Sequence, residues 1–395
     1  MLVVGAGPGG GELARQLAVA GISVTLVDRL PDLKRAAFSS AAMPLSAFLE
    51  LGLPAEVLGS RWSRWQLLGP SARWRSWHHG QPLGVVLDFA SLRQWFAQQV
   101  QCFGGQVCLG WSALACEPQA DGSLITTLRN TRGELQRVHS TWVVDATGQQ
   151  RSLIGEPSSP ADPMLRGVGV EWLLQLPQQE WQRWADQLSF VLGSAWVPQG
   201  YGWVFPMQTG LLKVGVCRLC ERGREQPPLQ QLQQRLLRLT GLGHGVVLDR
   251  HGGEIRSRVR RSDPHGHGQL LALGDAVSTG NLLGGEGIRY AMLSARVLAP
   301  LLLQALRQRR SNAVALAGRY QKHLSSTLGW RWALSGRLGR RTWLGLQNPA
   351  ADRRLEHWLG VLEQCSAEDL SALLFDYRFE RFGLRALPYL LGIGR

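Results

Sequence analysis

The stretch Gly5-Ala6-Gly7-Pro8-Gly9-Gly10 follows a short apolar segment, Leu2-Val3-Val4, at the start of the chain. Its first, third and sixth residues have the spacing GxGxxG. In such a loop the first glycine permits a tight turn, the second lets the backbone approach a pyrophosphate, and the third allows a helix to pack closely on a strand. The stretch therefore predicts a phosphate site at the N-terminus of a helix.

The residues around this loop complete a βαβ unit. Residues 11–20 have apolar positions at helical spacing, and residues 22–27 form an apolar stretch typical of a second strand. Asp28 stands at its end, close to the distance of about 20 residues at which a ribose-binding acid is expected. A glycine-rich turn that binds nothing is the alternative, and this complete context argues against it.

The composition bounds the class of protein. With 395 residues, of which 45% are hydrophobic, the chain can form a large core in two or three lobes. A net charge of +14 favours an anionic partner, such as nucleic acid, an acidic membrane surface or a phosphate-bearing ligand. The alternative is that most basic residues form a solvated face. No apolar run is long enough to span a bilayer, so we expect any membrane contact to be peripheral.

The cysteines and histidines predict neither a disulfide framework nor a metal site. The six cysteines have no regular spacing, which favours a reducing, cytoplasmic location. Cys217 and Cys220 form a lone CxxC within an apolar stretch and are interpreted as buried thiols. His265 and His267 flank a glycine without further ligands nearby.

The pattern along the chain predicts an interrupted α/β lobe. Strands are expected at 107–109, 123–128 and 142–148, whereas 156–260 contains alternating, tryptophan-rich segments around a glutamine-rich helix. A buried strand then returns at 270–275. We therefore predict a discontinuous lobe of residues 1–155 and 261–310, an antiparallel-sheet lobe of 156–260 and a helical region of 311–395.

A second glycine-containing motif strengthens the nucleotide interpretation. Gly274-Asp275-Ala276 ends the returning strand, and Gly284-Gly285-Glu286-Gly287-Ile288 opens a long helix. An acid in this place can hold a polyol hydroxyl, and glycines let backbone lie against a flat ring whose negative charge the helix N-terminus stabilises. Asp275 alone could be an ordinary helix cap. Together with the N-terminal loop, the motif predicts bound FAD.

These motifs resemble those of the geranylgeranyl reductase family, which carries GDA…GEGI. Residues 200–206, Gly-Tyr-Gly-Trp-Val-Phe-Pro, followed by Lys213-Val214-Gly215-Val216, are similar to that family's YxWxFP…VG segment. The family belongs to a larger group with aromatic hydroxylases, flavin halogenases and lycopene cyclases. The resemblance covers roughly residues 1–300 in motif order.

The resemblance implies an α/β fold, with a Rossmann-type GR2 FAD-binding lobe, an inserted antiparallel sheet that roofs the flavin, and a helical C-terminal region. The expected cofactor-binding residues are Gly5, Gly7, Pro8, Gly9, Gly10, Asp28, Gly148, Gly274, Asp275, Gly284, Gly285, Gly287 and Ile288. The substrate cavity is expected to include Trp203, Phe205 and Pro206. By residue type alone, the two aromatic side chains fit a sheet core equally well.

Three departures from the family pattern leave the reaction open. Residues 35–44 lack the Cys-Gly pair of archaeal prenyl reductases, Thr147 replaces the acid of the hydroxylase Asp-Gly motif, and residues 281–283 lack the usual proline. We expect an FAD-dependent oxidoreductase that reduces double bonds of a long isoprenoid, with NAD(P)H as a candidate electron donor. The alternatives are a monooxygenase, a lycopene-cyclase-like enzyme, or a non-catalytic flavin-binding assembly protein at a membrane. No catalytic residue can be named.

Two segments rich in arginine and tryptophan have alternative interpretations. Residues 61–77 could stack on nucleic-acid bases, but packing and cation–π pairs within a flavoprotein explain them as well, so no nucleic-acid partner is expected. The C-terminal set consists of Trp330, Trp332, Arg337, Arg340, Arg341, Trp343, Phe379, Arg381, Phe382 and Leu384. It fits either an interfacial helix on anionic lipid or a helix packed on the FAD lobe with a basic outer face.

Overall fold

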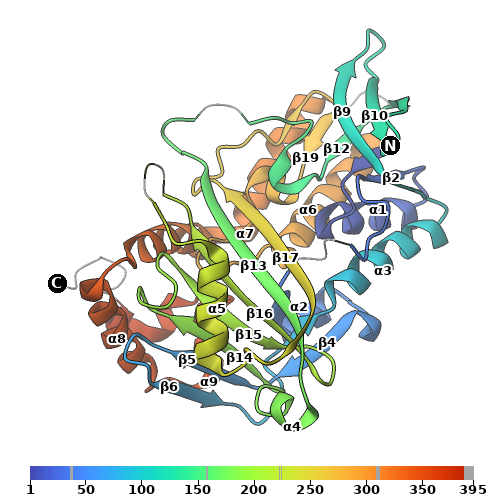
Figure 1. Ribbon diagram of the computed structural model, residues 1–395. Coiled ribbons are helices and arrows are strands. Elements are labelled where there is room, and N and C mark those ends of the chain that lie inside the picture. The colour runs from blue at the N-terminus through green and yellow to red at the C-terminus, as the bar shows by residue number, and fades with distance from the viewer. Residues whose placement is uncertain (36–38, 157–158, 222, 224, 308–311, 387–395) are drawn as a thin grey trace.

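The computed structural model describes residues 1–395 except 36–38, 157–158, 222, 224, 308–311 and 387–395 (Figure 1). Two large sheets organise this part of the chain. One is six-stranded and the other seven-stranded. The mixed α/β architecture with an antiparallel sheet and a helical C-terminal region confirms the predicted fold class.

The six-stranded sheet has the order β18-β19-β12-β1-β2-β8. All neighbouring pairs are parallel except β18 and β19. The bounds are β1 (Leu2–Val4), β2 (Thr25–Asp28), β8 (Gln106–Leu109), β12 (Val143–Asp145), β18 (Gly266–His267) and β19 (Leu270–Ala272). Parallel strands end at a common edge, so the residues that follow β1, β2, β12 and β19 meet there. That edge is where an open α/β sheet binds its ligand.

Three helices pack around this sheet: α1 (Pro8–Val19), α3 (Phe89–Cys102) and α6 (Ile288–Arg307) (Figure 1). Close approach requires glycine on α1. A Cβ added at Gly9 would lie 2.6 Å from Leu273 Cδ1, and one at Gly11 would lie 2.7 Å from Phe96 Cβ. Glu12, which is fully buried on α1, forms an ion pair of 2.8 Å with Arg296 of α6.

The seven-stranded sheet has the order β17-β13-β16-β15-β14-β5-β6. Its bounds are β5 (Arg64–Leu68), β6 (Trp74–His78), β13 (Leu165–Gln175), β14 (Gln187–Leu192), β15 (Gly200–Pro206), β16 (Leu211–Leu219) and β17 (Val246–Ser257). All neighbours are antiparallel except β5 and β14. Strands β5 and β6 come from residues 64–78, so the sheet also includes chain from outside 156–260. The division of the chain into lobes stays a prediction.

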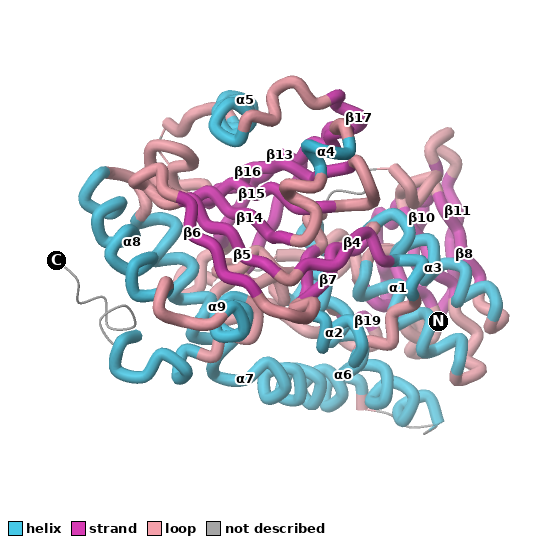
Figure 2. The backbone as a smooth tube through the Cα atoms, turned by 90° about the horizontal axis from the view of Figure 1, so that it is seen from below, coloured by secondary structure: helices cyan, strands magenta, loops and turns pink. Residues whose placement is uncertain are grey.

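Helices cover both faces of the seven-stranded sheet (Figure 2). On one face, α5 (Leu229–Thr240) buries Leu232, Leu236 and Leu237 against apolar residues of β13, β15 and β16. On the other face, α8 (Pro349–Leu362) and α9 (Ala367–Leu374) pack on an aromatic cluster that includes Trp62 and Trp65. The sheet is therefore a layer between helices.

The remaining elements connect these layers. Two small antiparallel sheets are β11-β10-β9 and β3-β7-β4. Their bounds are β3 (Ala42–Pro44), β4 (Leu58–Trp62), β7 (Gly84–Leu87), β9 (Trp111–Pro118), β10 (Leu124–Asn130) and β11 (Leu135–Ser140). The other helices are α2 (Leu45–Glu50), α4 (Gln178–Trp181), α7 (Ala313–Gly345) and 3-10 helices at Ala55–Val57, Gly148–Gln150, Gly274–Val277 and Phe379–Ala386. None of the described helices is long and apolar enough to cross a bilayer.

Most tryptophans of the arginine- and tryptophan-rich segment 61–77 pack inside the protein, whereas Trp74 is exposed. Trp62, Trp65 and Trp77 are buried in the aromatic cluster, where their faces cannot stack on bases. Arg75 is buried as well and pairs with Glu356 and Glu363 of the C-terminal region. These contacts favour the packing interpretation of the segment.

The C-terminal aromatic residues also point mostly inward. Trp330 is exposed, whereas Trp332, Phe379 and Phe382 are buried. The side chain of Leu384 lies outside the part of the chain that the structure describes. The arrangement favours a packed helical region with a basic outer face over an apolar interfacial helix.

Candidate active site

A cavity of about 590 Å³ lies where the carboxyl edge of the six-stranded sheet faces the seven-stranded sheet. Of the residues predicted from the sequence, it is lined by Gly5, Gly7, Pro8, Gly9, Asp28, Gly148, Trp203, Gly274, Asp275, Gly285, Gly287 and Ile288. Segments from both ends of the chain thus meet in one site. Gly10, Gly284, Phe205 and Pro206 are not part of the lining.

The glycines of the N-terminal loop serve two purposes. Gly5 has φ +109°, and a Cβ there would lie 2.2 Å from Ala146 O. A Cβ at Gly10 would lie 1.9 Å from Gly5 O, so both residues are required by packing. Gly7 lines the cavity, and a Cβ added to it would have no protein atom within 4 Å. The space beside Gly7 is therefore a cradle that a side chain would fill.

The N-terminus of α1 is arranged for an anion. No side chain caps it, and its first turn contains no acidic residue. Free backbone N–H groups and the helix dipole at such an end favour a phosphate. The residues present therefore fit the pyrophosphate of a dinucleotide.

Asp28 fixes the loop from the end of β2. Its carboxylate accepts hydrogen bonds from the backbone N–H groups of Ala6, at 2.7 Å, and Leu30, at 2.9 Å. A carboxylate has about four acceptor sites, so it can accept further bonds from ribose hydroxyls in the cavity that it lines.

A buried acid organises the turn after β12. Asp145 accepts hydrogen bonds from Thr147 N, Leu153 N and Ile154 N at 2.8–2.9 Å. The Thr147 hydroxyl also donates to it, at 2.7 Å. These bonds hold Gly148, at φ +66°, on the cavity wall. The acid that shapes this turn thus precedes Thr147 by two residues.

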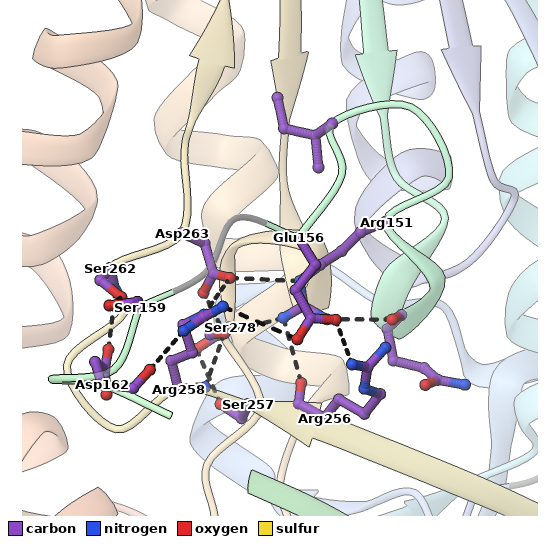
Figure 3. Close-up of polar contacts among 12 residues, drawn as sticks. Arg151, Glu156, Ser159, Asp162, Arg256, Ser257, Arg258, Ser262, Asp263 and Ser278 are labelled. Carbon is purple, nitrogen blue, oxygen red and sulfur yellow. Dashed lines mark hydrogen bonds and ion pairs between the residues drawn. The ribbon is translucent and has the colours of Figure 1, made fainter. Parts of the chain in front are cut away.

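Asp275 lies on the cavity wall, and Arg151, whose charge acts on it, belongs to a buried network of charges (Figure 3). Burial raises the pKa of Asp275, and Arg151 opposes that shift. Arg151 lies 3.4 Å from Asp263 and donates to the Ser278 hydroxyl at 3.0 Å. Arg258 lies 3.2 Å from the same aspartate. The network ties together the loops that follow β12, β17 and β19.

The seven-stranded sheet forms the opposite wall with Tyr201, Trp203 and Cys217. The Trp203 Nε1–H donates to the buried Glu171 at 2.9 Å, which fixes the indole. Tyr201 contacts the Trp343 ring of α7, with centroids 5.1 Å apart. Burial raises the pKa of the Cys217 thiol to about 12. The residue is nevertheless half-buried and lines the cavity, so it is not the fully buried thiol that the sequence suggested.

Phe205 lies outside the cavity, in the aromatic cluster of the sheet. Its ring meets Phe190 edge to face, with centroids 5.2 Å apart. It is 3% exposed, and Pro206 follows it at the end of β15. For Phe205 the geometry therefore favours the sheet-core interpretation that its residue type left open.

The glycines before α6 allow close contacts across the site. A Cβ at Gly285, which has φ +65°, would lie 2.2 Å from Tyr201 Oη, and one at Gly284 would lie 2.9 Å from Leu374 O. Burial raises the pKa of the neighbouring Glu286 to about 7, opposed by its ion pair of 2.8 Å with Arg289. The segment is thus locked between the sheet and the C-terminal region.

The segment 35–44 contributes serines in place of a thiol. Ser39 and Ser40 line the cavity, while Ala36, Ala37 and Phe38 lie outside the described residues. No cluster of metal-ligating side chains occurs among the residues that the structure describes.

Several lining or supporting residues were not predicted to belong to the site. Arg151, Arg93, Tyr201, Cys217 and Trp343 are brought to the site by tertiary structure. Asp145 ends a buried strand, and this position in the sequence is typical of an acid that holds the following turn. Tyr201 lies within the recognised 200–206 segment, although only its neighbours were assigned to the cavity.

The chain is similar in sequence to enzymes that reduce isoprenoids. It is 27% identical over 334 residues to a digeranylgeranylglycerophospholipid reductase of Haloferax volcanii, covering 78% of this chain and 76% of the relative. It is 25% identical over 319 residues to a geranylgeranyl diphosphate reductase of Synechocystis sp., covering 76% and 74%. No protein-family model matches the chain.

Solved structures share the fold. A geranylgeranyl bacteriochlorophyll reductase-like protein of Thermoplasma acidophilum matches 93% of this chain and 92% of its own, with a TM-score of 0.79 and 20% identity. A halogenase solved with FAD matches 99% and 85%, with a TM-score of 0.67 and 14% identity. These similarities support the interpretation of the chain as a divergent relative of the geranylgeranyl reductase family of FAD-dependent oxidoreductases.

Proposed function

We propose that the cavity holds FAD in an extended pose, with its adenosine end at Gly5 to Gly10 and Asp28 and its flavin end at Asp275 and residues 284–288. The observation that carries this is the meeting of both motifs on one cavity. Gly7 leaves space for the pyrophosphate, and the uncapped N-terminus of α1 attracts its charge. Gly148 and Gly274 let the backbone approach the cofactor without a side chain.

We propose that the substrate is a long isoprenoid whose carbon–carbon double bonds are reduced. The relatives' names support this substrate class. The apolar wall of Trp203, Tyr201 and Trp343 suits an alkene chain and excludes water. Bound FAD supplies a hydride once it has been reduced, and NAD(P)H is the proposed source of both electrons.

Saturation of each double bond also requires one proton at the other carbon. Tyr201 and Cys217 are proton-bearing side chains on the wall opposite Asp275. Burial raises the pKa of both groups, so both are protonated at neutral pH. We propose that this pair holds the proton for the alkene, with solvent restoring it afterwards.

A lipid substrate also suggests where the enzyme works. With a net charge of +14, the protein should be attracted to an anionic membrane surface, where long isoprenoids reside. We propose peripheral contact of this kind, through charge spread over the surface.

The test is product analysis under nitrogen and under air. The FAD-loaded protein is supplied with NADPH and geranylgeranyl diphosphate, and the products are identified by mass spectrometry. The proposal predicts products that gain hydrogen pairs in both atmospheres. Products that gain oxygen, and only in air, would instead establish a monooxygenase. Isomers of unchanged mass would establish a cyclase, and no turnover with bound FAD would support the assembly protein.

A further inference from the structure

A second cavity, of about 410 Å³, lies between α7 and the loops at 161–163 and 259–260 and is rich in arginine. It is lined by Ala161, Asp162, Pro163, Val259, Arg260, Arg337, Arg340, Arg341 and Leu344. Three of the arginines lie on α7 at positions i, i+3 and i+4, which share one helix face. The fourth extends from the loop after β17. Positive charge from two separate elements thus converges on one hollow.

Three of the four arginines have no side-chain partner in the part of the chain that the structure describes. The guanidinium groups of Arg260, Arg337 and Arg340 form no hydrogen bond or ion pair with any described residue, and all three side chains are exposed. Unpaired arginines gathered around a concavity repel one another and attract an anion. Their forked donors match the oxygens of a phosphate.

The one acidic residue among the described residues of the lining, Asp162, accepts its hydrogen bonds from backbone N–H groups. Asp162 accepts hydrogen bonds from Arg260 N at 3.0 Å and from Ser262 N at 3.1 Å; Figure 3 shows Asp162 beside Ser262 and Ser159. Buried Arg258 also donates to the Asp162 carbonyl oxygen. Asp162 therefore fixes the loop that presents Arg260, and its single negative charge is outnumbered by the four arginines that line the hollow. The hollow is a preformed site, because Arg258 ties its loop to the buried network around Asp263.

The hollow lies next to the proposed substrate cavity. Trp343 lines the large cavity, and the next residue of α7, Leu344, lines the arginine-rich one. The Trp343 indole N–H donates to Leu282 O at 2.9 Å, which holds this part of α7 against the cavity wall. A single molecule could therefore place its apolar chain in the large cavity and its anionic head in the arginine-rich one.

We propose that the hollow of Arg260, Arg337, Arg340 and Arg341 binds the phosphate or diphosphate head of the isoprenoid substrate. The identity of the phosphate as the head of an isoprenoid rests on the proposed function. Binding of a phosphate in the hollow can be measured without turnover. Substrates with an anionic head are then preferred over the corresponding alcohols. The site also orients the chain, because the head is held on one side of Trp343.

The first experiment measures inorganic diphosphate binding to the FAD-loaded protein by calorimetry. Wild type is compared with R337Q/R340Q and with R319Q, a control on the same helix whose exposed arginine has no partner among the described residues. Removing two charge-assisted contacts should weaken binding by at least about tenfold, whereas R319Q should bind as wild type does. Equal binding by all three proteins would overturn the site.

The second experiment identifies the source of the phosphate. The KM for geranylgeranyl diphosphate should rise at least about tenfold in R337Q/R340Q, while the KM for geranylgeraniol should not change. Binding to phosphatidylcholine vesicles that contain phosphatidylglycerol should be similar for both proteins. If R337Q/R340Q lost vesicle binding and kept the wild-type KM for geranylgeranyl diphosphate, the hollow would bind lipid headgroups and the proposal that it binds the substrate head would be refuted. A wild type that binds diphosphate but reduces no isoprenoid would leave the anion site standing and overturn the proposed function instead.

Discussion

Gly7 and Gly10 occupy the same turn but are constrained by different neighbours. A Cβ at Gly10 would collide with the backbone of Gly5, whereas one at Gly7 would enter the cavity. Gly7 also has an extended backbone, with φ −75° and ψ −177°, that any residue can adopt. A substitution of Gly10 therefore tests packing of the loop, and a substitution of Gly7 tests cofactor binding.

Replacing Gly7 with valine should remove FAD while leaving the protein folded. The branched side chain would fill the space proposed for the pyrophosphate, and we expect FAD affinity to fall by at least tenfold, or about 1.4 kcal/mol. Absorbance of the flavin and the Tm of the FAD-free protein measure the two effects. Gly243→Val, on an exposed loop with no atom within 4 Å, is the matched control. A Gly7→Val protein with full flavin content would contradict the proposed pose.

At the residue scale, the sequence could predict the glycines and acids that belong to local patterns. Asp28 and Asp275 each follow a strand, and both line the cavity. Arg151 could not be predicted, because its partners Asp263 and Ser278 are more than a hundred residues away along the chain. Phe205 is the converse case, since alternation along a strand does not tell which face borders a cavity.

Among the elements, α7 contains one glycine whose backbone conformation requires glycine and one whose conformation does not. Gly329 has φ +73° and ψ 178°, a conformation that is essentially restricted to glycine, and it marks a kink in the helix. Gly318 has no atom within 4 Å of an added Cβ and lies in the regular first half. The kink lets the second half of α7 pass the cavity at Trp343.

Alanine at these two positions should change the free energy of unfolding in opposite directions. Gly329→Ala should lower it by on the order of 1–3 kcal/mol, because alanine is strained in that conformation. Gly318→Ala should raise it by about 0.5–1 kcal/mol, since alanine loses less backbone entropy in a helix. Urea unfolding monitored by circular dichroism measures both. Equal effects of the two changes would show that the kink does not depend on Gly329.

At the element scale, helices and buried strands followed from local periodicity, but strand partners did not. The glutamine-rich helix expected within 156–260 is α5, Leu229–Thr240. The addition of β5 and β6 to the large sheet depends on the parallel pairing of β5 with β14, far away in the sequence. No local signal in residues 61–77 indicates such a partner.

For the molecule as a whole, a buried histidine couples stability to pH. Burial lowers the pKa of His265 to about 4, from an ordinary value of 6.5. Between these values the unfolded chain binds a proton that the folded protein does not, so this residue makes stability fall as the pH falls from 6.5 to 4. Its ring packs edge to face on Tyr320, with centroids 5.4 Å apart, which ties β18 to α7.

The contribution of His265 should be measurable as a difference between two proteins. The free energy of unfolding of wild type should rise with pH across this window by up to about 3 kcal/mol more than that of His265→Phe. Phenylalanine keeps the edge-to-face contact but cannot bind a proton. Denaturant unfolding at several pH values gives both curves. Parallel curves would mean that His265 is protonated equally in the folded and unfolded states.

The central claim is that reduced FAD in the cavity saturates an isoprenoid, and anaerobic single turnover tests it most directly. The purified protein, with its flavin reduced by dithionite and the excess removed, is mixed with geranylgeranyl diphosphate under nitrogen. The account predicts return of the oxidised flavin absorbance near about 450 nm, with one double bond saturated per flavin. A flavin that stays reduced in the presence of the isoprenoid, and is reoxidised only by oxygen, would contradict it.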